Sequence, residues 1–325
     1  MTPALPSRLI VADIGATNGR FAIATRQPDH STTLSQMSNI PCASVNSLEA
    51  LLERYIDELA GEVPMYVCLA IAGPNNGRSG HITNLDWIAD ASALEQRFGL
   101  KGVSFANDFA ALACMAPRLP ESSLVTIKHG TAVAGAAVSV IGPGTGLGVS
   151  IVVPTADDFI TVSTEGGHQS FAPVTDREKA LRDYLQPGLG HVSIETVLCG
   201  RGLARINDFL VATSGNGMRG LDPAEVSSAA IAGTDETCAE AVRLFLQILA
   251  SAAGDFALVH GALGGVFIGG GILPRLKPML SESAFSERFC AKGPMQSYLE
   301  QIPVYMINAD HVAMHGAANL YRGAI

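Results

Sequence analysis

The sequence predicts an α/β protein built around a largely parallel β-sheet that is covered by helices. Apolar segments typical of strands alternate along the chain with amphipathic segments typical of helices. Two glycine-rich strand–turn–strand segments, 9–24 and 138–153, resemble each other and suggest an internal duplication. The 325 residues are 48% hydrophobic and 16% charged, which excludes general disorder and leaves room for one large or two medium domains.

The first third of the chain gives the clearest pattern of elements. Residues 9–24 predict a hairpin, because two apolar runs flank a turn that contains Gly15, Thr17 and Gly19. Residues 47–59 predict an amphipathic helix, since apolar residues recur at helical spacing behind Ser47, a favourable N-cap. The elements predicted next are a short strand at 65–71, a helix at 92–98 and a strand at 102–106.

The second half repeats the opening pattern. In the segment 138–153, Thr145 occupies the turn position that Thr17 has in the first hairpin. A helix predicted at 240–259 is followed by the segment 264–272, in which a strand ends on three glycines. No Pro- or Ser-rich linker marks a domain boundary, so the chain is free to cross between domains more than once.

Charge and cysteine usage exclude several classes of protein. Lys and Arg number 21 against 30 Asp and Glu, giving a net charge of −9, and no basic run offers a surface for nucleic acid. The six cysteines include no C-x-x-C pair, which argues against a zinc site or a disulfide framework. We therefore expect reduced thiols and a cytoplasmic protein with no nucleic-acid partner.

Membrane segments are not expected either. Residues 1–12 lack the apolar run of a secretory signal. The uncharged stretch 130–156 is long enough to span a bilayer, but its six glycines, two prolines and alternating pattern favour buried strands joined by tight turns.

Glycines that follow a strand indicate phosphate binding, because they allow main-chain N–H groups to approach an anion closely. A threonine hydroxyl in the same turn adds a donor or a metal ligand. The chain has no Gly-Lys pair, so it contains no G-x-x-x-x-G-K-[ST] loop. The single G-x-G-x-x-G match, at 215–220, follows a helical pattern at 203–211 rather than a strand, and we interpret it as a loop.

Two carboxylates and an amide lie where ligand binding or catalysis is expected. Asp13 lies among apolar residues of the first hairpin, where a carboxylate is costly unless it is paired or near a metal; the alternative is a turn-capping role. Asn107 and Asp108 lie where a strand ends and a helix starts at Phe109, the position at which α/β sheets bind ligands. Asp108 is interpreted as an N-cap, a general base, or both.

Two further segments carry polar groups suited to a small ligand. Glu165 and His168 flank two glycines in a predicted loop. Glu195 comes early in a helix that Ser193 is able to cap, where a carboxylate is also favoured by the helix dipole alone. Neither G-x-S-x-G nor H-E-x-x-H occurs, which disfavours hydrolase chemistry.

Six motifs, in their order and spacing, resemble the bacterial ATP-dependent glucokinases over nearly the whole chain. The motifs are Asp13 to Asn18, Asn107 to Phe109, Gly142 to Gly148, Glu165 to His168, His191 to Glu195 and Gly264 to Pro274. The resemblance implies the two-domain actin-like ATPase fold (ribonuclease H-like) of sugar kinases and Hsp70, with duplicated phosphate hairpins and a cleft between domains. It implies a small domain of residues 1–118 plus 309–325 and a large domain of residues 119–308.

The resemblance also implies roles for individual residues. Asp108 would be the base that accepts the sugar 6-hydroxyl proton, and Asp13 would hold Mg²⁺ through water. The sugar-binding residues would be Asn107, Asp108, Glu165, His168 and Glu195. The nucleotide-binding residues would be Ala12, Asp13, Ile14, Gly15, Ala16, Thr17, Gly142, Gly144, Thr145, Gly146, Gly269, Gly270 and Gly271. Ala16 and Gly19 depart from the family, in which Gly and Ala are more usual at these positions.

The function implied is the ATP- and Mg²⁺-dependent phosphorylation of glucose to glucose 6-phosphate, the entry to glycolysis, by a cytoplasmic homodimer. The absence of a Cys-rich zinc loop disfavours the related repressor-and-kinase group. Alternatives are a kinase of another hexose, a kinase using ADP or polyphosphate as donor, and a non-catalytic sugar or nucleotide sensor on the same fold. Trp87, the single tryptophan, is expected on a loop that borders the sugar.

Overall fold

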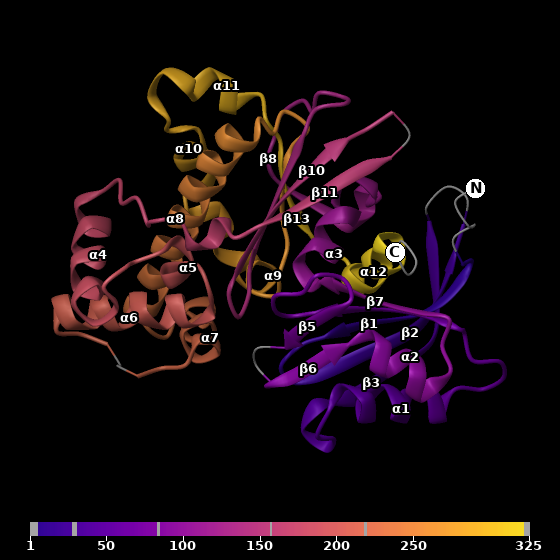
Figure 1. Cartoon of the computed structure of the whole chain (residues 1–325). Helices are drawn as coiled ribbons and strands as arrows, with labels where there is room; N and C mark the ends of the chain where they lie inside the picture. Colours follow the sequence, from indigo (N-terminus) through magenta and orange to yellow (C-terminus); the bar gives the residue numbers. More distant parts are fainter. Residues whose placement is uncertain (1–5, 28–30, 83–84, 157, 218–219, 322–325) are drawn as a thin grey trace. The chain divides into compact units, whose positions relative to one another are not determined.

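The structure is a computed structural model that describes residues 6–27, 31–82, 85–156, 158–217 and 220–321 (Figure 1). Contacts between Cα atoms divide the chain into two compact units. Unit 1 consists of Met1–Arg118 and Ala309–Ile325, and unit 2 of Leu119–Asn308. The chain therefore leaves unit 1 and returns to it at its C-terminal end.

Unit 1 is built on a five-stranded sheet of order β3-β2-β1-β4-β7. Its strands are β1 (Arg8–Ile14), β2 (Asn18–Arg26), β3 (Thr32–Pro41), β4 (Tyr66–Ile71) and β7 (Gly102–Asn107). β1, β4 and β7 run parallel, whereas β2 and β3 continue β1 as an antiparallel meander. A separate two-stranded sheet consists of β5 (Ser79–Ile82) and β6 (Trp87–Asp90).

Helices cover both faces of this sheet, because alternate residues of its central strand are buried on opposite sides. Ile10 and Ile14 share an apolar cluster with α1 (Leu48–Glu58) and α2 (Ala91–Phe98). Leu9 and Val11 share another with α3 (Asp108–Met115) and α12 (Val312–Leu320). Short 3₁₀ turns lie at η1 (Cys42–Ser44) and η2 (Ala116–Arg118). The predicted cover of helices is thus confirmed, and on the second face it includes the C-terminal helix (Figure 1). The prediction of a largely parallel sheet is wrong: the sheet is mixed, because β2 and β3 add antiparallel strands to the parallel strands β1, β4 and β7.

The predicted helices begin close to the expected residues. Ser47 caps α1 by accepting a hydrogen bond from the N–H of Ala50 at 3.2 Å, as predicted. The helix predicted at 92–98 begins at Ala91, because the Asp90 carboxylate accepts hydrogen bonds from the N–H groups of Ser92 and Ala93.

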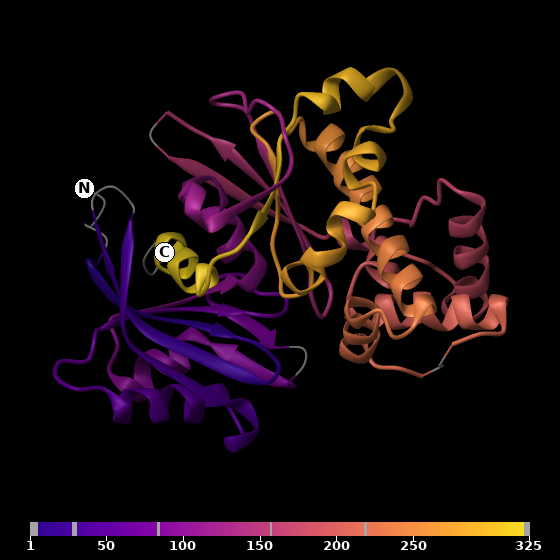
Figure 2. The ribbon, with the colours of Figure 1, turned by 180° about the vertical axis from the view of Figure 1, so that it is seen from behind.

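Unit 2 repeats this strand arrangement in a six-stranded sheet of order β11-β10-β9-β12-β13-β8 (Figure 2). Its strands are β8 (Leu124–Lys128), β9 (Val138–Pro143), β10 (Leu147–Pro154), β11 (Phe159–Thr164), β12 (Val266–Ile268) and β13 (Val304–Ile307). β9, β10 and β11 form an antiparallel meander, and β12 and β13 run parallel to β9. The order therefore matches that of unit 1 strand for strand before β8 is added, which confirms the predicted duplication.

The helices of unit 2 pack around α8 (Glu236–His260), which supplies much of the apolar core. The others are α4 (Asp176–Leu189), α5 (Ile194–Val197), α6 (Gly200–Ser214), α7 (Pro223–Ala232), α9 (Leu273–Leu276), α10 (Phe285–Cys290) and α11 (Gln296–Glu300). Short 3₁₀ turns are η3 (Glu121–Ser123), η4 (Gly166–His168), η5 (Lys277–Glu282) and η6 (Gly293–Met295). α8 is longer than the predicted helix 240–259, because Asp235 caps it earlier.

Two sequence features suggestive of a membrane have a different explanation in the fold. The stretch 130–156 contains the hairpin β9–β10, so it forms strands, as expected. Within the described residues, α8 is long and apolar enough to cross a bilayer, but 72% of its most apolar window is buried inside the fold. We interpret α8 as a core helix.

The cysteines and the discarded glycine motif agree with the sequence interpretation. All six cysteines are buried as thiols. Gly215 ends α6 with φ 72°, the left-handed conformation that favours glycine at a helix C-terminus. Met218 and Arg219 of the same motif lie outside the described residues.

Candidate active site

Unit 1 brings three strand ends together at one edge of its sheet. In the parallel register, Ile14 lies beside Ile71, and Ile71 lies beside Asn107. Asp13 immediately precedes Ile14 in the chain, and Asp108 immediately follows Asn107. Both residues are therefore at the carboxyl edge of these parallel strands, where ligands bind in α/β sheets. The charge of Asp13 reaches Asp108 and contributes to its pKa.

Asp108 is the first residue of α3, and Asn107 rather than Asp108 is the N-cap. The Asn107 side chain accepts a hydrogen bond from the N–H of Ala110 at 2.9 Å. The prediction that the helix starts at Phe109 is wrong by one residue, because the Asn107 amide oxygen satisfies the first turn. The cap interpretation of Asp108 is therefore also wrong, although its Oδ1 accepts a hydrogen bond from the N–H of Phe109 at 2.8 Å.

The environment of Asp108 raises its pKa to about 6. Burial of the carboxylate is the main cause, and the negative charge of Asp13 adds to it, whereas the hydrogen bond from Phe109 opposes both. A carboxylate with such a pKa is ionised at neutral pH and is still basic enough to accept a proton from a reacting hydroxyl.

Asp13 lies inside β1, directly opposite Arg20 of β2 in the hairpin register. Its Oδ2 is 3.1 Å from the Arg20 Nη1, and its side chain is 26% exposed. Burial raises the pKa of Asp13, while the charges of Arg20 and His311 act against that rise. The turn-capping alternative is wrong, because the residue lies in a strand and its carboxylate is paired across it.

Sequence reasoning missed Arg20 and His311. Arg20 had a detectable signal, since counting outward from the turn of the hairpin places it opposite Asp13. His311 had no such signal, because it lies 298 residues after Asp13 in the chain. It immediately precedes α12 and has φ 59°. His315, four residues further on in α12, makes a hydrogen bond with Thr32 of β3.

The first glycine turn is closed by main-chain hydrogen bonds. The N–H of Gly15 donates to the carbonyl of Asn18 at 3.0 Å, and the N–H of Cys42 donates to the carbonyl of Thr17 at 2.9 Å. Ala12 and Ile14 point into the core with no exposed surface, so only their main chain lies near the turn. Ala16 lies in the turn between Gly15 and Thr17.

Gly19, the other departure from the family pattern, has a local reason. A Cβ atom at this position would lie 2.7 Å from the Cδ2 atom of Leu51 on α1. The space of an alanine methyl is therefore already filled by the leucine.

The second glycine turn joins β9 to β10 in unit 2. The N–H of Gly144 donates to the carbonyl of Gly146 at 2.8 Å, and the N–H of Gly200, at the start of α6, donates to the carbonyl of Gly144 at 2.9 Å. Thr145 at the tip is exposed, whereas Gly142 is buried in β9. The exposed main chain of this turn has the composition of an anion-binding loop.

A third glycine cluster approaches the same hairpin. The N–H of Gly269 donates to the carbonyl of Ile141 at 2.8 Å. Gly270 has φ 85°, and a Cβ atom there would lie 2.5 Å from the carbonyl oxygen of Pro143. Glycine is required at position 270 for both reasons. At the next residue, Gly271, a Cβ atom would meet nothing within 4 Å.

The polar residues predicted to bind sugar in unit 2 come from two adjoining segments. Glu165 directly precedes η4 and His168 is the last residue of η4. Their side chains are 89% and 62% exposed, and Oε2 of Glu165 lies 3.8 Å from Nε2 of His168. The N–H of Ile194 donates to the carbonyl of Gln169 at 2.8 Å, which ties α5 to this segment. Ser193 caps α5 as predicted.

Glu195 makes a contact that the sequence did not predict. Its Oε2 accepts a hydrogen bond at 2.8 Å from the N–H of Leu147, the residue that ends the second glycine turn. Unit 2 therefore joins a predicted sugar-binding carboxylate to a predicted phosphate turn.

The predicted site residues thus fall into two groups, one in each unit. Unit 1 gathers Asp13, the turn around Gly15 and Thr17, and the pair Asn107 and Asp108. Unit 2 gathers the turn 142–146, the triplet 269–271 and the carboxylate and imidazole groups at 165, 168 and 195. Throughout the described part of the chain, no cluster of three or more His, Cys, Asp or Glu side chains could hold a metal ion.

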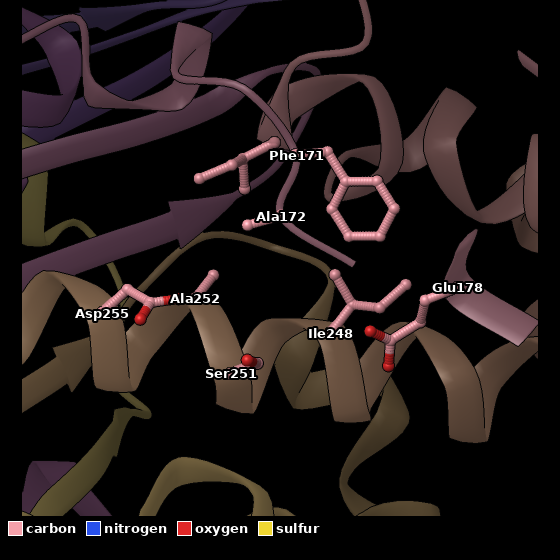
Figure 3. A pocket seen from close by; sticks show the side chains of 8 residues that line it. Phe171, Ala172, Glu178, Ile248, Ser251, Ala252 and Asp255 are labelled. Carbon is pink, nitrogen blue, oxygen red and sulfur yellow. The ribbon is translucent and has the colours of Figure 1, made fainter. Parts of the chain in front are cut away.

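A small cavity of about 20 Å³ lies elsewhere in unit 2 (Figure 3). Phe171, Glu178, Ile194, Ile248 and Asp255 are among the residues that line it. Glu178 is 1% exposed and is paired with Arg288 at 2.5 Å. A cavity of this size holds about one water molecule, so it is too small for a sugar or a nucleotide.

Trp87 is the first residue of β6 rather than part of a loop, so that prediction is wrong in its detail. It is partly buried and packs against the apolar cluster under α1 and α2. Thr83 and Asn84, in the segment before it, lie outside the described residues.

The chain is similar to known proteins over nearly its whole length. Residues 10–324 match the family model described as Glucokinase. A glucokinase from Saccharophagus degradans is 38% identical over 309 residues, covering 95% of this chain and 96% of the relative. The crystal structure of a glucokinase from an Antarctic psychrotroph is 40% identical, with a TM-score of 0.86 over 97% of this chain and 98% of that one.

A more distant solved structure shares the fold. The ROK family glucokinase from Streptomyces griseus, solved in complex with glucose and AMPPNP, is 20% identical, with a TM-score of 0.62 over 97% of this chain and 99% of that chain. The predicted actin-like ATPase fold is thus confirmed. Because the family model spans nearly all of the sequence and a curated relative is 38% identical over 95% of it, this chain belongs to the glucokinase family.

Proposed function

We propose that this chain transfers the γ-phosphoryl group of ATP to the 6-hydroxyl of glucose, forming glucose 6-phosphate at the entry to glycolysis. The ATP-dependent glucokinase activity follows from the family to which the chain belongs. The observation that carries the proposal within the structure is Asp108, a partly buried carboxylate with a pKa of about 6 at the carboxyl edge of the parallel strands β1, β4 and β7.

In the proposed mechanism, Asp108 accepts the proton of the sugar 6-hydroxyl as the oxygen attacks the γ-phosphorus in line. The pKa of about 6 suits this role, because the carboxylate is ionised in the resting enzyme and the transfer is not strongly uphill. Asn107, Glu165, His168 and Glu195 bind the remaining sugar hydroxyls. Hydrogen bonds from main-chain N–H groups hold the side chains of Asn107 and Glu195 in place.

The three glycine clusters bind the nucleotide. The turn at Ala12–Thr17 and the turn at Gly142–Gly146 offer main-chain N–H groups and threonine hydroxyls to the phosphates, and Gly269–Gly271 lies on the adenosine side. Ala16 adds a methyl to the first turn, in which the N–H of Gly15 already donates to the carbonyl of Asn18.

Asp13 fits a magnesium ion held through water. Its carboxylate is partly exposed and only one oxygen is paired, with Arg20, and the described residues offer no all-protein metal cage. Mg²⁺ is commonly bound by one or two carboxylates together with substrate phosphates. When bound, the ion would neutralise phosphate charge that no P-loop lysine is present to neutralise.

We further propose a cytoplasmic homodimer without a nucleic-acid or membrane partner. The net charge of −9 and the lack of a basic run support the first exclusion, and the burial of α8 supports the second. The six buried thiols are compatible with a reducing compartment.

The test is a panel assay with purified protein. Glucose, mannose, fructose and glucosamine are each offered with ATP, ADP or polyphosphate in the presence of Mg²⁺, and products are identified by ³¹P NMR. We expect glucose with ATP to give the highest kcat/KM and a 6-phosphate product. A higher kcat/KM for another pair would identify another hexose or donor, and no turnover with sugar bound would indicate a sensor.

A further inference from the structure

The main chain of Leu147 lies between the second glycine turn and the sugar-binding segments of unit 2. Its N–H donates to Oε2 of Glu195 at 2.8 Å. Its carbonyl oxygen lies against Gly167, where a Cβ atom would overlap that oxygen. The main chain of one residue therefore contacts both α5, which carries Glu195, and η4, which follows Glu165 and ends at His168.

The Glu195 carboxylate also leaves no room for a side chain at Gly146 in the turn. A Cβ atom built on Gly146 would lie 2.5 Å from Oε2 of Glu195 and 3.2 Å from its carboxyl carbon. By contrast, a Cβ atom on Gly144, two residues earlier in the turn, would meet nothing within 4 Å. Glu195 thus packs on one side of the turn and leaves the other side open.

Both partners of this contact are held by other bonds. The turn is closed by the hydrogen bond from Gly144 to Gly146 and is joined to α6 through Gly200. α5 is tied to η4 through Ile194 and Gln169 and is capped by Ser193. Because both segments are held in this way, a shift of the Glu195 carboxylate displaces the turn.

A carboxylate has two oxygens and accepts several hydrogen bonds. While one oxygen of Glu195 accepts the N–H of Leu147, the other is able to accept a sugar hydroxyl. Each bond fixes the carboxylate and lowers the entropy cost of making the other.

We infer that Glu195 is a positioning residue for the phosphate turn as well as a sugar ligand, and that it couples glucose binding to nucleotide binding. Glucose held by Glu195 fixes the N–H of Leu147 and with it the turn 144–146. Since coupling between two ligands is reciprocal, nucleotide in the turn tightens glucose equally. This inference rests on the proposed function of Glu195 and of the turn.

The first experiment places a methyl group in the contact. Gly146→Ala displaces the Glu195 carboxylate without removing its charge, and Gly146 has no positive φ that alanine would strain. Glucose affinity is measured by calorimetry without nucleotide. We expect Gly146→Ala to raise the glucose Kd at least ~5-fold, the lower end of typical coupling effects. Gly188→Ala in α4 is the control, because it lies outside the proposed site and its Cβ atom would meet nothing within 4 Å; its glucose Kd should stay within twofold of wild type. Equal glucose affinity in wild type and Gly146→Ala overturns the inference.

The second experiment tests the pathway through Glu195. Glu195→Asp is one methylene too short to reach both partners, and it is combined with Gly146→Ala in a double-mutant cycle on glucose Kd. We expect the two effects to be non-additive, because both break the same contact. Additive effects overturn the inference.

The third measurement needs no turn variant, so it stands even if Gly146→Ala does not fold. The Kd of AMPPNP with Mg²⁺ is measured with and without saturating glucose. We expect glucose to tighten AMPPNP at least ~5-fold in wild type and less than twofold in Glu195→Asp. An unchanged ratio in the variant overturns the inference, whereas a wild-type protein that binds no glucose overturns the proposed function instead.

Discussion

At the scale of single residues, the proposed chemistry depends on two partly buried carboxylates, Asp108 and Asp13. Asp108 has a pKa raised to about 6 by burial and by the charge of Asp13. Asp13 has its own pKa raised by burial, but Arg20 lies across the hairpin and offsets part of that rise. The two groups therefore have different tasks: Asp13 is paired and Asp108 is left basic.

The raised pKa predicts how activity depends on pH. The base must be ionised, so kcat/KM for glucose should fall as the pH drops through about 6, with a slope of one proton. Initial rates from pH 4.5 to pH 8 at saturating Mg²⁺ measure this. A profile that stays flat down to pH 4.5 would show that Asp108 is not the titrating base.

The same shift predicts a stability effect with a definite sign. The ordinary pKa of an aspartate is 3.8, so the ionised Asp108 carboxylate lowers the free energy of unfolding above pH about 6. This destabilisation disappears towards pH 4, where the carboxyl is protonated in both the folded and the unfolded protein. Asp108→Asn should therefore stabilise the ligand-free protein at pH 8, by up to about 3 kcal/mol for a shift of roughly two units. Urea unfolding at pH 8 and at pH 4.5 measures the difference, which should shrink at the lower pH. A destabilised variant at pH 8 would refute the burial argument.

Asp13 carries a separate prediction about magnesium. Asp13→Asn removes the charge but keeps the size, so half-maximal activity should require at least ~10-fold more Mg²⁺, the loss typical of a group that supports a bound metal. Activity titrated against Mg²⁺ at fixed ATP checks this, and EDTA should abolish turnover in both proteins. Arg20→Lys serves as a control that keeps the opposite charge. An unaltered magnesium requirement in Asp13→Asn would remove Asp13 from the metal site.

At the scale of elements, the position of Asp108 depends on the packing of α3 against α12. Gly316 of α12 faces Ala111 of α3, and a Cβ atom on Gly316 would overlap the carbonyl oxygen of Ala111. The two helices share an apolar cluster with β1 that includes Met314. A residue near the C-terminus therefore sets how closely the helix that begins with Asp108 approaches its neighbour.

Gly316→Ala should accordingly destabilise unit 1 and disturb the site together. We expect a loss of about 1–3 kcal/mol from overpacking and a lower kcat, because α3 must move. Gly188→Ala is the control, since Gly188 lies in α4 with nothing within 4 Å of its Cβ position; it should be neutral or slightly stabilising. Thermal unfolding and glucose kinetics of both variants provide the measurement. Equal melting temperatures would contradict the close contact.

Most elements were predictable because their signals are local. Ser47 as a cap and the hairpin with Thr145 follow from residues a few positions apart. The start of α3 was misplaced because either Asn107 or Asp108 is able to cap a helix, and only the hydrogen bond to Ala110 distinguishes them. The contact of Glu195 with Leu147 spans 48 residues and follows no periodic pattern, so the sequence held no signal for it.

At the scale of the whole molecule, duplication explains why the chain has two similar turns. The order β3-β2-β1-β4-β7 in unit 1 corresponds to β11-β10-β9-β12-β13 in unit 2. Each unit thereby presents a glycine turn between the first two strands of its meander. The copies have diverged: the first has Asp13 just before its turn, whereas the second has Glu195 packed on it.

The central claim is that Asp108 is the base of a glucose kinase, and one comparison tests it most directly. Glucose phosphorylation by wild type and by Asp108→Asn is measured at saturating ATP and Mg²⁺, while calorimetry records glucose binding to both. We predict that kcat falls by ~10²–10⁴-fold, the usual contribution of a positioned base, while the glucose Kd changes by less than ~10-fold. A kcat within tenfold of wild type, with glucose still bound, would contradict the account.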